Sequence, residues 1–107
     1  MAEKETSKQK IKVVEVDVLK PHKPSIVELG KALCKIKSVQ NANISVYAID
    51  EKTESIKATL EGNDINFDEV EKTIDLYGAV IHSIDKVIVG KKKVIDVPTI
   101  NTKEISK

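Results

Sequence analysis

Four side chains in two strand-like stretches could together bind a divalent cation: they are Glu15, Asp17, His82 and Asp85. The first two alternate with valines between residues 11 and 19, and the other two belong to the apolar stretch 79–89. If these stretches lie side by side in one sheet, they supply carboxylate oxygens and one imidazole, a set that suits calcium, magnesium or manganese. The alternative is that His82 is a half-exposed strand residue and that the acids are solvated.

Other polar side chains near these stretches give weaker signals. Lys20 and His22 follow the first stretch and would border the cation site. A small enzyme is the alternative use of the same residues, with His82 as general base at a subunit interface and a carboxylate that orients it. Cys34 is expected to be a small buried apolar side chain rather than a reactive thiol. A non-enzymatic protein is favoured, because no serine has an evident base partner.

The composition disfavours several classes of protein. The chain has 107 residues with 18 Lys and no Arg, which argues against bidentate recognition of phosphate or carboxylate groups. The single cysteine rules out an intramolecular disulfide and a cysteine-based metal cluster, and it fits a reducing cytoplasm. Only 3% of the residues are aromatic, so the expected central strands offer no rings on which RNA bases would stack. High Lys and Glu usage is also typical of heat-loving organisms.

Charge is distributed unevenly along the chain. Residues 1–12 carry +2 and residues 91–107 carry +3, whereas residues 13–90 carry −4, which together give the net charge of +1. The Lys-rich ends leave weak nucleic-acid binding as a third class of function, although the acidic body opposes it. We interpret residues 1–10 as a disordered basic arm and residues 91–107 as a basic linker with a C-terminal extension.

Hydrophobic periodicity predicts two successive strand-helix-strand units. In the first, a helix begins at Ser25, which forms a capping box with Glu28. In the second, a helix begins after Asn66 and ends at Gly78. Each helix has one apolar stripe at spacing i, i+3, i+7 and i+10, composed of Ile26, Leu29, Leu33 and Ile36 and of Phe67, Val70, Ile74 and Tyr77.

The connections between the units predict the fold. Strands at 44–49 and 56–61 are joined too closely for a crossover, so they form an antiparallel hairpin. With right-handed crossovers, residues 11–90 form a ferredoxin-like β-α-β-β-α-β sandwich. In this α+β fold, two helices cover one face of an antiparallel four-stranded sheet whose first and third strands are central. Residues 94–100 are expected to form a short extra strand, which Pro98 restricts to an edge.

The face of this sheet without helices is expected to be partly apolar. Its exposed residues would be Val13, Leu19 and either Tyr47 with Ile49 or Val46 with Ala48. A monomer rarely leaves such a surface in contact with water, so a homo-oligomer is expected. The extra strand 94–100 is a candidate for addition to the sheet edge of a neighbouring copy.

Four short motifs resemble an archaeal family catalogued as domain of unknown function 211. They are DVLKPH at 17–22, PSIVEL at 24–29, NISVY at 43–47 and VIHSID at 80–85. The resemblance covers about residues 11–90 and leaves both basic ends outside. It implies a ferredoxin-like fold, an archaeal cytoplasmic protein and homo-oligomeric assembly, and it assigns no activity.

These observations predict a cytoplasmic homo-oligomer that serves as a non-enzymatic binding or scaffold module. Its expected partners are further copies of the chain and either a small ligand or a divalent cation. A membrane is not an expected partner, because the sequence has neither a membrane-spanning apolar run nor a signal-peptide pattern.

Overall fold

The computed structural model describes residues 9–91. Its elements are β1 (Lys10–Pro21), α2 (Ile26–Cys34), β2 (Asn41–Ile49), β3 (Thr53–Glu61), α3 (Phe67–Leu76) and β4 (Val80–Gly90). Most of the predicted basic arm, residues 1–8, and the whole predicted strand 94–100 lie outside the described residues.

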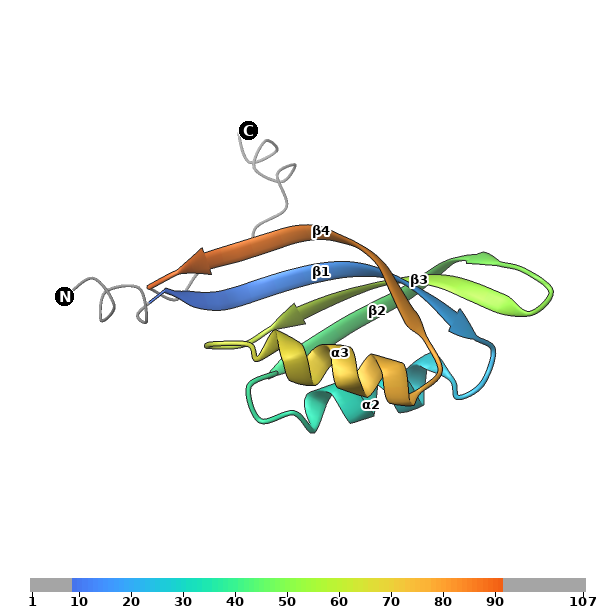
Figure 1. The fold of residues 1–107 in the computed structure, drawn as a ribbon, viewed down its shortest axis with the longest axis horizontal. Helices are drawn as coiled ribbons and strands as arrows, with labels where there is room; N and C mark the ends of the chain where they lie inside the picture. Colours follow the sequence, from blue (N-terminus) through green and yellow to red (C-terminus); the bar gives the residue numbers. More distant parts are fainter. Residues whose placement is uncertain (1–8, 92–107) are drawn as a thin grey trace, which may run out of the picture.

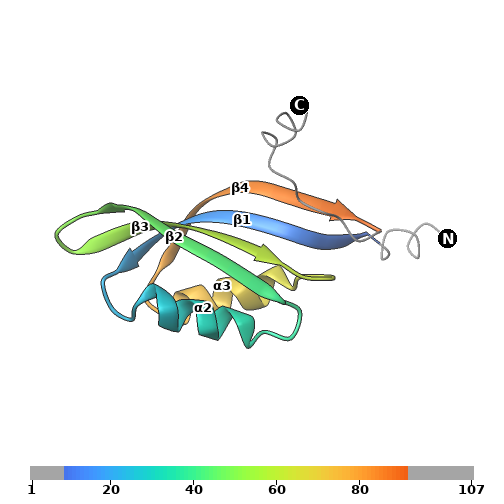
Figure 2. The same ribbon diagram turned by 180° about the vertical axis from the view of Figure 1, so that it is seen from behind.

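The four strands form one antiparallel sheet in the order β2-β3-β1-β4. Figure 1 and, from behind, Figure 2 show that both helices pack on the same face of this sheet. β1 and β3 occupy the centre, and β2 and β4 are the two edges. The predicted ferredoxin-like α+β fold is confirmed. The face without helices is called the open face below.

Both helices begin at the predicted residues. The Ser25 hydroxyl accepts a hydrogen bond from the Glu28 N–H at 3.2 Å, and the Glu28 carboxylate accepts one from the Ser25 N–H at 3.0 Å. Asn66 accepts from the Glu69 N–H at 3.2 Å. After α3, Gly78 has a φ of +74°, a left-handed conformation that a side chain would strain. Local sequence therefore sets where each helix lies along the sheet. No helix within residues 9–91 is long and apolar enough to cross a membrane.

The core is aliphatic and lies between the sheet and the helices. Its members include Val14, Val16, Val18, Ile56, Leu60, Leu29, Leu33, Val70 and Ile74. Each of these side chains is at most 2% exposed. Because successive strand residues point to opposite faces, Glu15 and Asp17 of β1 are directed to the open face.

β4 pairs with β1 through two bulges near its middle. His82 and Asp85 are each an extra residue on β4, at two of the three points where the pairing with β1 shifts register. The apolar residues of β4 do not follow a single alternation between the two faces of the sheet, and these bulges explain why. They bring Ser83 opposite Asp17 on the open face, and Figure 1 shows that β4 bends along its length.

The predictions for the open face hold only in part. Val13, which is expected to be exposed, is only 3% exposed, and it is flanked by Glu61 of β3 and Ile88 of β4. Leu19 is 44% exposed. Tyr47 is 57% exposed on the open face, whereas Ile49 is 70% exposed but pairs with Glu54, which lies on the helix side with Lys20. The shift in register at Tyr47 therefore separates the two residues of this predicted pair.

Candidate functional site

A polar network crosses the open face from β2 to β4. The Tyr47 hydroxyl donates to the Asp17 carboxylate, with 2.7 Å between Oη and Oδ2. Lys57 Nζ lies 2.8 Å from Asp85 Oδ2 and 3.7 Å from Glu15 Oε2. The same Nζ lies 6.0 Å from the centre of the Tyr47 ring. The network therefore contains side chains from all four strands and is centred on one lysine.

Hydrogen bonds shift the pKa values within this network. The pKa of Tyr47 is raised, chiefly by its hydrogen bond to Asp17. The pKa of Lys57 is raised chiefly by its hydrogen bond to Asp85. The pKa of Asp85 is lowered first by Lys57 and then by Ser83, whose hydroxyl donates to Asp85 Oδ1 at 2.7 Å. Each shift favours the form that is already present at neutral pH, so the network resists titration near pH 7.

Three of the four predicted cation ligands lie in this network. Glu15 and Asp85 both contact Lys57, and Asp17 is the residue that pairs with Lys57 between β1 and β3. His82 is exposed at its bulge, and its charge makes the smallest contribution to lowering the pKa of Asp85. Within residues 9–91, no group of three or more His, Cys, Asp or Glu side chains is arranged to hold a metal ion. The lysine ammonium supplies the positive charge among these carboxylates.

Lys20 lies in a different cluster, on the helix side of the sheet. Its side chain is fully buried. Its Nζ donates to the carbonyl oxygens of Pro21 at 2.7 Å, His22 at 3.2 Å and Pro24. It also lies 3.1 Å from Glu54 Oε1. Lys20 thereby anchors the loop between β1 and α2 to the start of β3.

His22 completes this cluster from the solvent side. Its Nδ1 lies 3.3 Å from Glu54 Oε2, and its Nε2 lies 3.0 Å from the Glu51 carbonyl oxygen. Both partners are acceptors, so only the doubly protonated ring donates to both. The pKa of His22 is accordingly raised, first by the Glu51 carbonyl and then by Glu54, and the pKa of Glu54 is lowered, first by His22 and then by Lys20. We call Lys20, His22 and Glu54 the Lys20 clasp.

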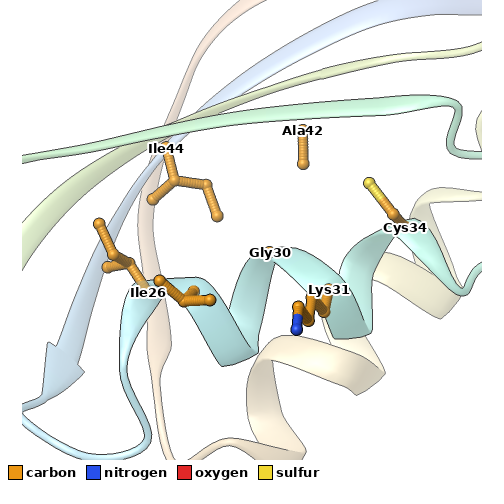
Figure 3. A pocket seen from close by; sticks show the side chains of 7 residues that line it. Ile26, Gly30, Lys31, Cys34, Ala42 and Ile44 are labelled. Atoms are coloured by element: carbon orange, nitrogen blue, oxygen red, sulfur yellow. The ribbon is translucent and has the colours of Figure 1, made fainter.

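An open apolar groove of about 410 Å³ lies between α2 and β2 (Figure 3). Its lining includes Ile26, Val27, Gly30, Cys34, Ala42 and Ile44. Gly30 leaves space there, because a methyl group on its Cα would make only ordinary contact with Ile44 Cδ1, at 3.5 Å. Cys34 is exposed, so the prediction that it is buried is wrong. It follows the buried Leu33, and adjacent helical residues point about 100° apart.

A second apolar surface surrounds the free edge of β4. We call it the β4 patch, and it consists of Val80, Ile84, Val87 and Val89. These side chains are 49–63% exposed. Val80 pairs with Leu19 on the open face, whereas Ile84 and Val87 lie on the helix side, beyond the cover of α3. All four side chains therefore belong to the edge strand β4 and lie on both of its faces.

The strand order, the two helices on one face and the capped connections define a ferredoxin-like α+β domain. A family model for domain of unknown function 211, described as uncharacterized ArCR, matches residues 12–103. An uncharacterized protein of Methanocaldococcus jannaschii is 43% identical over 89 residues, which cover 83% of this chain and 92% of the relative. The chain belongs to this archaeal family, as the four motifs predict. The match extends past Gly90 to residue 103, farther than those motifs.

Proposed function

We propose that this protein is a non-enzymatic scaffold that assembles from copies of its own chain through the β4 patch. The observation that carries the proposal is the exposure of four large aliphatic side chains along one edge strand. Soluble monomers seldom expose a cluster of large aliphatic side chains without a partner. A symmetric pair of copies is the simplest assembly that covers the same patch on both.

The free energy gained when the β4 patch is buried between two copies is sufficient for reversible association. Full burial of a Val, Leu or Ile side chain contributes about 1.5–3 kcal/mol, so a half-exposed side chain contributes about 1 kcal/mol when it is covered. Four such side chains on each of two copies supply roughly 8 kcal/mol, which lies within the range of about 4–15 kcal/mol that association costs. The patch alone therefore supports a weak dimer, and a tighter assembly needs a further contact.

The polar groups of the described residues support a binding module better than an enzyme. General acid–base catalysis works best with a pKa near the operating pH. The pKa shifts of Tyr47, Lys57 and Asp85 all point away from neutrality. His22 has both ring nitrogens within hydrogen-bonding distance of acceptors in its own chain. These side chains therefore stabilise the sheet and its loops rather than act on a substrate.

Light scattering on the purified full-length chain tests the proposal. We expect an average mass above the 11.8 kDa of one chain at micromolar concentration, and we expect it to decrease on dilution. A constant mass of one chain across the same dilution series would refute self-assembly.

A further inference from the structure

We propose that residues 94–100 of a second copy add as a strand to the outer edge of β2, with Ile95 and Val97 in the groove between α2 and β2. This inference rests on the proposed self-assembly and names the contact that strengthens it. It assigns an occupant to the groove in Figure 3 and a role to the C-terminal extension.

The shape of the β2 edge favours an extended peptide. β2 is an edge of the sheet, so the backbone groups on its outer side pair with no other described strand. From Asn41 to Val46 it pairs with β3 without a register shift, which leaves a regular outer edge. Ala42 and Ile44 of this same stretch line the groove. An added strand would satisfy the backbone edge and insert alternate side chains into the groove.

The C-terminal extension has the composition for this role. The segment VIDVPTI at 94–100 is rich in β-branched residues, and Ile95 and Val97 would share one face of an extended chain. Pro98 is compatible with an added strand, because that strand becomes the new edge of the sheet. The family match extends to residue 103 and so includes the segment. The +3 charge of residues 91–107 also complements the −4 charge of residues 13–90.

The reach of the linker indicates that the segment comes from another copy. β4 and β2 are opposite edges of the sheet, separated by β1 and β3. A strand added outside β2 lies four strand spacings from β4, about 19 Å, whereas the four residue steps from Gly90 to Val94 extend at most about 14 Å. The free edge of β4 is nearer to the segment, but the bulges at His82 and Asp85 interrupt its regular geometry.

The rate of Cys34 modification by a maleimide tests this docking in the full-length protein. Cys34 is the only cysteine of the chain, and it is exposed at the groove. We expect Ile95→Asp to accelerate the modification by about tenfold or more, because the loss of one buried isoleucine weakens binding by about that factor and raises the fraction of unoccupied grooves accordingly. The matched control is Val94→Asp, which places the same charge on the opposite face of the strand and should leave Cys34 protected.

Two further experiments decide which copy provides the segment 94–100 and whether the segment lies in the groove. Dilution of the wild type should accelerate the modification toward the Ile95→Asp rate, and slow modification that is independent of concentration would overturn the assignment to a second copy. Gly30→Leu should fill the groove and lower the mass measured by light scattering, whereas Gly30→Ala should not, since its methyl group makes only ordinary contact.

The outcomes separate this inference from the proposed function. An oligomer in which wild type, Ile95→Asp and Val94→Asp react at equal rates would refute the docking and leave self-assembly in place. A monomeric wild type would remove both.

Discussion

The hydroxyl of Tyr47 on β2 donates a hydrogen bond to Asp17 on β1, across the full width of the intervening strand β3. The register of β2 explains this reach, because its pairing with β3 shifts between Val46 and Ala48 and leaves Tyr47 as an extra residue. The side chain of Tyr47 therefore extends over Lys57 toward the centre of the open face. This contact connects an edge strand to the network of acids around one lysine.

Replacement of Asp17 should change the titration of Tyr47. The hydrogen bond to Asp17 raises the pKa of Tyr47 in the fold, so its stabilising contribution is complete below about pH 10, the ordinary value, and is lost as the pH rises through the raised value. Asp17→Asn should lower the pKa of Tyr47. Ultraviolet titration in a Tyr77→Phe background, which leaves one tyrosine, measures it. An unchanged midpoint would contradict the contact.

Replacement of Lys57 should create affinity for a divalent cation. Lys57 contacts Glu15 and Asp85 and supplies the charge that a metal ion would otherwise provide. Lys57→Met removes that charge while it preserves most of the side-chain volume, so we expect Mn²⁺ or Ca²⁺ to raise the melting temperature of the variant more than that of the wild type. The control is Lys52→Met in the hairpin turn. An equal or larger shift in the wild type would show that Lys57 does not exclude the ion.

Loss of the buried lysine should be strongly destabilising. Lys20→Met leaves Glu54 and three backbone carbonyls without their shared donor, and we expect the free energy of unfolding to fall by about 3–5 kcal/mol. Lys12→Met is the matched control, since Lys12 is only 5% exposed but makes one side-chain hydrogen bond, at 2.8 Å to Asn63. Its expected cost is about 1 kcal/mol. Urea denaturation measures both, and equal losses would contradict the clasp.

The Lys20 clasp should make stability depend on pH. The raised pKa of His22 gives a contribution that is complete below its ordinary value of 6.5 and is lost as the pH rises through the raised value. The lowered pKa of Glu54 gives a contribution to stability that is complete above its ordinary value of 4.5 and is lost as the pH falls through the lowered value. Both contributions to stability are present between pH 4.5 and 6.5.

His22→Ala should therefore reduce the urea midpoint more at about pH 5.5 than at about pH 8.5. In a Glu54→Gln background this difference between the two pH values should shrink. The same loss at both pH values in the wild-type background would mean that the charged histidine does not stabilise the fold.

The fold was predictable from local signals, because the caps at Ser25 and Asn66 and the left-handed Gly78 each specify one connection. The burial of Lys20 also has a signal in the sequence, since it continues the alternation of the buried valines of β1. That pattern places Lys20 on the helix side, away from the acids of the open face.

The polar network was only half predictable. The alternation of β1 places Glu15 and Asp17 on the open face, but the bulges in β2 and β4 decide that Tyr47 and Asp85 join them. Bulges depend on pairing with a neighbouring strand, which periodicity within one strand does not encode. The α2–β2 groove is likewise a product of packing between two elements, and only Gly30 marks it in the sequence.

The light-scattering mass of Ile84→Lys, measured beside the wild type, tests the central claim of self-assembly most directly. Ile84 is 55% exposed in the middle of the β4 patch, so lysine should be tolerated in the fold and costly in a contact between copies. The control is Gln40→Lys, which adds the same charge at an exposed position outside the patch. We predict that Ile84→Lys has a lower mass than the wild type and Gln40→Lys at equal concentration, with an unchanged circular dichroism spectrum. Equal masses for all three proteins would contradict assembly through the β4 patch.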